Sequence, residues 1–564
     1  AIKFRGVNRH EHDMVTGKVI SRESMLRDIQ LMKASNINAV RTSHYPNDEY
    51  WYRLCDKYGI YVVDEANIEC DGMAFHPLQT LSDHSDWTAA YLDRTRRMVE
   101  RDKNFTSIIT WSLGNESRFG KNFVATYNWV KARDKSRPVQ YEEARENEYT
   151  DIFCPMYKAT PVLLDYVKEW RKRPLILSEY AHMMGNSGGV LKADWDLVNK
   201  YPQLQGGFIW DFSDQTFARK DSAGNPIWAY GSDMGQVGAT SDTSFCADGL
   251  FQANREPHPQ AFEMQQVYAP VGFEAAGIMS DQVRIFNRYD FTNLDQLDLS
   301  WRLRADGKDM AVESIPPVSL AAHESALVSL GIPSFFQEPG KKYFLYLEAR
   351  LRKARGLLPA NFLVAREQLA IPGLPPAANT NFHTGEQLTL TREDKSIAVS
   401  NSRFTVVFDR GTGWLSRWTI AGKDVLAAPL QPDFWRPVTD NDIGNSLQVR
   451  CMPWFDPLQS AIVKDLRISD STDSVVVVHA EHEFPAVGSR YTSEYRIYPD
   501  GIIEVQVSLK AGDSSQPELP RFGMKVLVNQ SLHTVSWLGR GPFDNYADRK
   551  AAAFIDTYTL DAAA

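Results

Sequence analysis

Several features that mark large classes of protein are missing from the sequence. No apolar run approaches the roughly 20 residues that a membrane-spanning helix needs, so we expect no membrane partner. Cysteine is scarce, because the 564 residues include only 5, and no two of them are spaced as C-x-x-C. A small, odd and scattered set of cysteines indicates neither a disulfide framework nor a zinc site. It favours a reducing compartment, and we expect the protein to be cytoplasmic.

An excess of basic residues is also absent. The chain has 62 Lys and Arg against 71 Asp and Glu, which gives a formal net charge of −9. Because proteins that bind nucleic acids usually carry a basic face, we expect no nucleic-acid partner. The P-loop motif G-x-x-x-x-G-K-S/T and the metalloprotease motif H-E-x-x-H do not occur, so neither chemistry is indicated.

The composition is otherwise that of a globular protein, with 43% hydrophobic and 24% charged residues. Its length predicts several domains, since a single core rarely grows past about 250–300 residues. The chain begins Ala-Ile-Lys-Phe, without Met, and ends in three alanines directly after a strand-like stretch. We therefore expect it to be a piece of a longer protein.

Residues 1–215, within a predicted catalytic domain of residues 1–268, alternate apolar, strand-like runs with amphipathic helices. Eight strands are predicted, at residues 2–8, 38–43, 60–65, 107–113, 138–142, 151–156, 174–179 and 205–211. Two of the helices are predicted at 21–35 and 86–101, with Asp86 able to cap the second. This order predicts a catalytic (β/α)₈ TIM barrel. A doubly wound sheet is the alternative, but it favours a Gly-rich fingerprint after the first strand, and the sequence has none there.

After residue 268 the pattern changes to period-two alternation, which is typical of antiparallel strands. Residues 269–375 predict an immunoglobulin-like β-sandwich, with strands at 283–291, 297–304 and 343–351. A proline-rich stretch then marks a boundary, and residues 376–564 predict a large β-sandwich domain that is truncated at its end. The predicted fold is therefore multidomain, a barrel followed by two β-sandwiches.

Two glutamates lie where a barrel places its catalytic groups, at the carboxyl ends of strands. Glu116 follows the apolar fourth strand, and Glu179 ends the seventh. A facing pair of carboxylates is what glycoside hydrolysis uses, one as acid/base and one as nucleophile or second base. The alternative is that each glutamate caps the next helix or pairs with an arginine.

Other strand ends contribute polar groups, which together predict a pocket that binds hydroxyl groups. They include Asn8, His10, His12, Arg41, His44, Asp64, Glu65, Asn67, Tyr157, His182, Trp210, Asp211 and Asp214. Just past the third strand, Glu69 and Asp71 are two residues apart and could bind a divalent cation. Oxygen ligands suit Mg²⁺ rather than Zn²⁺.

Five collinear motifs resemble the bacterial lactase-type β-galactosidases of glycoside hydrolase family 2. They are RGVNRHEH at 5–12, NAVRTSHYP at 38–46, YVVDEANIE at 61–69, WSLGNES at 111–117 and LSEYAH at 177–182. The resemblance continues through 205–211, 440–444 and 537–549, so it covers nearly the whole chain.

The resemblance implies a retaining exo-β-galactosidase that acts on lactose-like β-galactosides through a galactosyl-enzyme. In this reading Glu179 is the nucleophile, and Glu116 is the acid/base. The implied substrate-binding residues are His10, His44, Asn115, Tyr157, His182 and Trp210.

The resemblance also implies two metal sites, each with a departure from the family pattern. Mg²⁺ would be bound by Glu69, Asp71 and Glu116, although the family usually has His where this chain has Asp71. The added negative charge should raise the pKa of Glu116 unless the metal offsets it. Na⁺ would be bound by the Phe245 carbonyl and Asp248, where Asn is usual, with a further ligand from an upstream domain.

The resemblance further implies β-domains before the barrel, a continuation after residue 564, and a parent protein that is a homo-oligomer. Two other functions stay open. One is a β-glucuronidase or β-mannosidase of the same fold. The other is a non-catalytic carbohydrate-binding fragment, because a fold does not by itself establish a function. Sugar binding that is unchanged when either glutamate loses its charge would favour the binding fragment.

Overall fold

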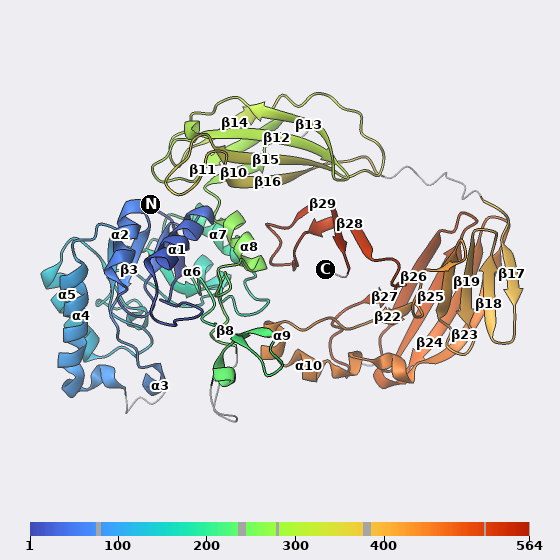
Figure 1. Cartoon of the computed structure of the whole chain (residues 1–564), viewed down its shortest axis with the longest axis horizontal. Helices are drawn as coiled ribbons and strands as arrows, with labels where there is room; N and C mark the ends of the chain where they lie inside the picture. The colour runs from blue at the N-terminus through green and yellow to red at the C-terminus, as the bar shows by residue number, and fades with distance from the viewer. Residues whose placement is uncertain (75–79, 235–243, 278–280, 376–384, 513–514, 563–564) are drawn as a thin grey trace. The chain divides into compact units, whose positions relative to one another are not determined.

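A computed structural model describes residues 1–564 apart from 75–79, 235–243, 278–280, 376–384, 513–514 and 563–564 (Figure 1). The chain forms two compact units. The first comprises residues 1–337, 341–373 and 538–557, and the second comprises 338–340, 374–537 and 558–564. In the described part of the chain, the helices are all too short or too polar to cross a membrane.

The first unit begins with a sheet of seven parallel strands in the order β5-β4-β3-β2-β1-β7-β6. The strands are β1 (Phe4–Asn8), β2 (Ala39–Arg41), β3 (Tyr61–Glu65), β4 (Ile108–Ser112), β5 (Val139–Gln140), β6 (Leu175–Tyr180) and β7 (Leu204–Ile209). They correspond to seven of the eight predicted strands.

The remaining predicted strand, at 151–156, is not a regular strand, and that part of the prediction is wrong. The segment still lies between β5 and β6, because the Asp151 N–H donates to the Val139 carbonyl (2.8 Å). On its other side, isolated parallel bridges join Phe153 to Leu175 and Met156 to Glu179. A proline at position 155 removes one backbone donor, which interrupts a regular ladder. The ring of eight segments is nevertheless complete, and the predicted barrel is confirmed.

Helices follow the strands as predicted. α1 (Arg22–Ala34) is capped by Ser21, whose side chain accepts from the Ser24 N–H, and it buries Met25, Ile29 and Met32. The other helices of this part are α2 (Glu49–Tyr58), α3 (Asp71–Ala74), α4 (Thr88–Asp102), α5 (Lys121–Arg133), α6 (Thr160–Tyr166), α7 (Leu191–Lys200) and α8 (Pro259–Val267).

One predicted cap is wrong. Asp86 lies within a 3₁₀ turn, η2 (Ser85–Trp87), and α4 starts at Thr88 without a side-chain cap. The polar 85–87 segment therefore forms its own turn before the amphipathic run begins. Between β5 and the 151–156 segment, the short 3₁₀ turn η3 (Glu142–Ala144) stands in place of a full helix.

The barrel interior is apolar toward the amino ends of the strands and more polar toward their carboxyl ends. Every second residue of a strand faces the interior, since successive residues point to opposite faces. Phe4, Ala39, Val63 and Ile176 belong to one buried apolar cluster. Two residues farther along their strands lie polar or small residues, which therefore face the same interior nearer the carboxyl ends. These are Gly6, Arg41, Glu65 and Ser178.

The rest of the first unit is antiparallel β-structure, as predicted. One sheet has the order β10-β11-β14, and the other has the order β13-β12-β15-β16. The strands are β10 (Val271–Ala275), β11 (Gln282–Asn287), β12 (Leu297–Ala305), β13 (Lys308–Ile315), β14 (Ser325–Ser329), β15 (Tyr343–Leu351) and β16 (Leu363–Ile371). Buried residues of both sheets, such as Ile285 and Trp301, share one core, which makes a sandwich. Residues 538–557 join this unit, where Glu263 accepts from the N–H groups of Ala551 and Ala552 (2.9 Å each).

The second unit is mainly β-structure. Its two larger sheets have the orders β17-β18-β19-β20-β21 and β23-β24-β25-β26. The strands are β17 (Thr389–Arg392), β18 (Ser396–Ser400), β19 (Phe404–Asp409), β20 (Leu415–Ile420), β21 (Lys423–Asp424), β23 (Ile462–Ser471), β24 (Val476–Phe484), β25 (Ser489–Ile497) and β26 (Ile503–Lys510). Phe408 and Val478, from different sheets, pack in one core. The predicted multidomain class of a barrel followed by β-sandwiches is thus confirmed, while the domain boundaries stay predictions.

Candidate active site

Arg41, the last residue of β2, organises the carboxyl end of the barrel. Its side chain is almost fully buried, so its charge needs partners. Nε and Nη2 donate to the two Glu65 oxygens (2.7 and 3.0 Å). Nη1 donates to Asn8 Oδ1 (3.0 Å) and Glu179 Oε1 (2.8 Å), and Nη2 also donates to Asn115 Oδ1 (2.8 Å). One guanidinium therefore links the ends of β1, β2, β3, β4 and β6.

Glu179 is held by two donors, one on each carboxylate oxygen. Arg41 contacts Oε1, and the Tyr157 hydroxyl donates to Oε2 (2.8 Å). Burial, followed by the neighbouring Glu179 charge, raises the pKa of Tyr157, so that this phenol keeps its proton at neutral pH. His44 Nε2 lies 4.0 Å from Oε1. With 4% of its surface exposed, Glu179 is a nearly buried carboxylate whose orientation is fixed on both sides.

Glu116 lies in a different environment, in the loop after β4. Its side chain is only partly buried, and its backbone N–H donates to Glu142 Oε1 (2.8 Å). Burial, and then the negative charges of Glu179, Glu69 and Asp71, raise the pKa of Glu116 to about 7. The contribution of Asp71 has the direction that its negative charge predicts. Near neutral pH, Glu116 exists in both protonation states.

His10, His44 and Trp210 form an aromatic wall at the same end of the barrel. The His44 and Trp210 rings are stacked, with centroids 5.2 Å apart, and His10 meets both rings edge to face. His10 Nδ1 lies 3.2 Å from the Tyr45 hydroxyl. Burial and the nearby charges of His44 and Lys18 lower the pKa of His10 well below its usual value, so this ring is neutral.

His182 lies in a second group with Trp210, Asp248 and Phe245. The Trp210 Nε1–H donates to Asp248 Oδ2 (2.9 Å), and His182 Nε2 is 3.6 Å from the same oxygen. The Phe245 ring centroid lies 5.8 Å from that of His182. Asp248 Oδ1 is buried and has no hydrogen-bond partner within the described residues. An orphaned oxygen of this kind fits the Na⁺ ligand that the resemblance implies.

The implied Mg²⁺ ligands are not brought together as a preformed site. Glu69 Oε2 accepts from Asn115 Nδ2 (2.8 Å), and burial raises the pKa of Glu69. Asp71 is near enough to act electrostatically on Glu116. However, among the residues that the structure describes, no three His, Cys, Asp or Glu side chains gather closely enough to hold a metal ion. The oxygen donors suit Mg²⁺ in kind but do not fit it in this arrangement.

The sequence does not predict the contacts of several residues that shape the site. Arg41 and Glu65 were recognised only as polar strand ends, and their pairing could not be known before the strands were placed side by side. Glu142 was overlooked. Burial raises its pKa well above the usual value, and it accepts the Glu116 N–H. It is the last residue of the predicted fifth strand, at 138–142, so the strand-end rule could have found it.

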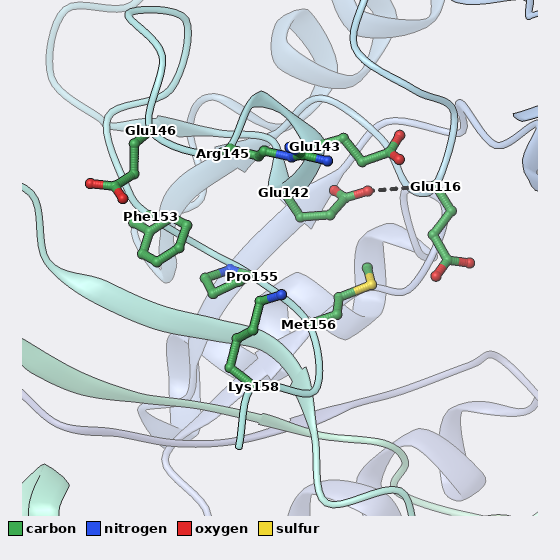
Figure 2. Close-up of a pocket in the computed structure, with 9 residues that line it drawn as sticks. All are labelled: Glu116, Glu142, Glu143, Arg145, Glu146, Phe153, Pro155, Met156 and Lys158. Atoms are coloured by element: carbon green, nitrogen blue, oxygen red, sulfur yellow. Dashed lines mark hydrogen bonds between the residues drawn. The ribbon is translucent and has the colours of Figure 1, made fainter. Parts of the chain in front are cut away.

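A cavity of about 570 Å³ opens beside Glu116 (Figure 2). One wall is the loop after β5, and the other is the segment that leads from the barrel to α6. Its lining residues are Glu116, Glu142, Glu143, Arg145, Glu146, Phe153, Pro155, Met156 and Lys158.

Three family models match the chain in sequence. Residues 1–273 match the TIM barrel domain of glycosyl hydrolases family 2. Residues 283–372 match domain 4 of β-galactosidase, and residues 400–564 match the β-galactosidase small chain. Together the three matches span both units.

Curated relatives are similar over nearly the whole chain. A β-galactosidase of Priestia megaterium is 37% identical over 563 residues, covering 98% of this chain and 54% of the relative. A β-galactosidase of Vibrio cholerae is 39% identical over 583 residues, covering 99% of this chain and 55% of the relative. The chain thus spans about half the length of the curated relatives it matches.

Among solved structures, the chain is similar to a β-glucuronidase of Faecalibacterium prausnitzii. The TM-score is 0.36 at 23% sequence identity, covering 47% of this chain and 49% of that chain. A β-glucuronidase of Ruminococcus gnavus gives a TM-score of 0.37 at 20% identity, covering 47% and 50% of the two chains.

Proposed function

The barrel of residues 1–273 belongs to family 2 of the glycosyl hydrolases, and from this premise we propose that the chain carries the catalytic centre of a retaining exo-β-galactosidase. The proposed reaction is hydrolysis of terminal β-D-galactosyl residues from lactose-like substrates. The names of the relatives that match over 98–99% of the chain support the choice of galactose.

The observation that carries the proposal is the contrast between two glutamates at the carboxyl ends of β4 and β6. Glu179 is clamped between Arg41 and the Tyr157 hydroxyl, which suits a nucleophile that must attack from one fixed position. Glu116 has a pKa of about 7, which suits a group that must give and then take a proton near neutral pH. Two carboxylates with separate roles, set by their surroundings, are what a glycosidase requires.

In the first step, protonated Glu116 gives its proton to the glycosidic oxygen while Glu179 attacks the anomeric carbon. The bond to the leaving group breaks, and an ester forms between Glu179 and galactose. In the second step, the Glu116 carboxylate takes a proton from water, and the resulting oxygen attacks the same carbon and releases Glu179. Two inversions give net retention, for which the carboxyl groups need to be about 5–5.5 Å apart.

The surrounding side chains are proposed to bind the sugar. Asn115 is positioned by Arg41 and by Glu69, which leaves it well oriented to bond the 2-hydroxyl. His10, His44 and His182 are proposed to bind further hydroxyl groups. Trp210 is proposed to present an apolar surface to the ring.

Four further features of the whole protein stay predictions. They are a cytoplasmic location, homo-oligomerisation, an Mg²⁺ ion near Glu69, Asp71 and Glu116, and an Na⁺ ion near Phe245 and Asp248. No step above depends on either metal. Turnover measured after chelation, and again after Mg²⁺ is restored, tests the first ion. Turnover in a sodium-free buffer, before and after Na⁺ is added, tests the second.

The proposal is tested with 4-nitrophenyl glycosides. We expect release of nitrophenol from the β-D-galactoside and little from the β-D-glucuronide or β-D-mannoside, with loss of release in Glu179→Gln. Faster release from either of the other glycosides would instead support the glucuronidase or mannosidase alternative. Galactose binding without any turnover, unchanged in Glu179→Gln and Glu116→Gln, would support the carbohydrate-binding fragment.

A further inference from the structure

The cavity beside Glu116 has two walls of different character (Figure 2). Figure 2 shows Met156 beside Glu116, with Pro155 and Phe153 farther along the same segment. These three side chains make an apolar surface on which a ring can lie. A volume of about 570 Å³ is within the range of pockets that take small ligands.

The acidic residues of the cavity carry less free negative charge than their number indicates. Glu142 is buried, and its Oε1 already accepts the Glu116 backbone N–H (2.8 Å). Glu146 Oε2 is 2.7 Å from Arg171 Nη1, so its charge is neutralised locally. Glu143 Oε2 accepts a hydrogen bond from the Tyr141 hydroxyl (3.1 Å).

The two cations of the cavity differ from these acids because their charges are uncompensated. Within the described part of the chain, the Arg145 and Lys158 side chains have no hydrogen bond or ion pair. The Arg145 backbone is nevertheless anchored, since its N–H donates to the Glu142 carbonyl (3.0 Å). Its φ of 53° is uncommon for a residue other than glycine. Lys158 comes from the opposite wall (Figure 2).

We propose that this cavity receives the leaving group, and that Arg145 and Lys158 make it selective for leaving groups that carry a carboxylate. The proposal rests on the proposed function, in which Glu116 gives its proton to the leaving oxygen. That oxygen must then lie within hydrogen-bond reach of Glu116, so the group attached to it occupies the adjoining space. A ring placed on Met156 and Pro155 would carry its substituent toward the two free cations, which attract a negative charge.

The test compares two galactosides of nearly the same shape, 3-carboxyphenyl β-D-galactoside and 3-carbamoylphenyl β-D-galactoside. Dissociation constants are measured by calorimetry on the full chain in the Glu179→Gln background, where the ligands stay intact. We expect the carboxylate to bind more tightly, with a preference that falls as ionic strength rises. Arg145→Gln and Lys158→Met should each reduce the preference by about two- to fivefold, since a partly exposed ion pair contributes about 0.5–1 kcal/mol.

Lys172→Met is the matched control, because Lys172 is an exposed lysine outside the cavity. It should leave the preference unchanged. Equal affinity for the two ligands, failure of the carboxylate to bind, or a preference that survives both cation variants would overturn the proposal. Turnover of 4-nitrophenyl β-D-galactoside by the unsubstituted chain reports on the proposed function separately, because its leaving group carries no carboxylate.

Discussion

Arg41 and Glu179 are joined by a contact of 2.8 Å between Nη1 and Oε1, with both side chains almost excluded from solvent. The same guanidinium neutralises Glu65, which is fully buried. The arginine therefore supports two carboxylates, of which only one is proposed to react. Its removal should affect both the fold and the chemistry.

Arg41→Gln should destabilise the protein strongly. It leaves the buried Glu65 without its main cationic partner, and losing one member of a buried pair costs about 3–5 kcal/mol. Urea unfolding, followed by tryptophan fluorescence, measures the change. Arg97→Gln is the control, because Arg97 pairs with Asp93 on an exposed helix surface, and this change should leave the unfolding free energy nearly unchanged. Equal effects of the two substitutions would contradict the structural role given to Arg41.

The pH profile should show an alkaline limb governed by Glu116. This carboxyl must be protonated to act as the acid, and its pKa is about 7, so kcat/KM should fall as pH rises through that value. Asp71→Asn removes one of the charges that raise this pKa, and should move the limb to lower pH. The measurement is kcat/KM for 4-nitrophenyl β-D-galactoside between pH 5 and 9, a range chosen to span that value. A limb that stays in place in Asp71→Asn would contradict the electrostatic coupling.

Glu142 should make the protein less stable as pH rises. Its folded-state pKa is raised above the usual value of 4.5, so the folded protein holds a proton that the unfolded chain gives up. The stability contributed by the protonated group is present below about pH 4.5 and is lost progressively as pH rises toward the folded-state pKa. Glu142→Gln keeps an acceptor for the Glu116 N–H and removes this loss. Its thermal midpoint should therefore exceed that of the unsubstituted chain by a margin that grows as pH rises above about 4.5.

The matched control for that experiment is Glu143→Gln, at the next position in the same turn. It should not reproduce the growing margin, because the Glu143 side chain is less buried. If the thermal midpoints of Glu142→Gln and the unsubstituted chain differ by the same amount at every pH, Glu142 is ionised in the folded protein as it is in the unfolded chain.

Tyr157→Phe should reduce turnover while preserving the fold. The phenol donates to Glu179 Oε2, and a hydrogen bond to a charged group contributes about 1.5–3 kcal/mol, which corresponds to about 10- to 150-fold in rate. Tyr127→Phe is a suitable control, since it loses a similar bond to Asp151 (2.9 Å) away from the two glutamates. Similar turnover rates for the two variants would show that the Tyr157 hydroxyl does not contribute to catalysis.

The strand-end rule explains how much of this site was predictable. Glu116 and Glu179 could be selected from the sequence because each directly follows an apolar strand, and the barrel places such residues at one end. The network around Arg41 could not be predicted, since its partners Asn8, Glu65, Asn115 and Glu179 lie at the ends of four other strands and meet only after the barrel closes. The irregular segment at 151–156 was mistaken for a strand because its apolar pattern outweighed the single proline. The raised pKa of Glu142 depends on burial, which no local pattern reveals.

The central claim is that Glu179 forms a covalent bond with the sugar. The most direct measurement is peptide mass spectrometry after reaction with 2,4-dinitrophenyl 2-deoxy-2-fluoro-β-D-galactoside, an activated substrate whose fluorine slows the second step. The account predicts one fluorogalactosyl group on the peptide that contains Glu179, and no label in Glu179→Gln. A label on another residue, or turnover of 4-nitrophenyl β-D-galactoside that persists in Glu179→Gln, would contradict it.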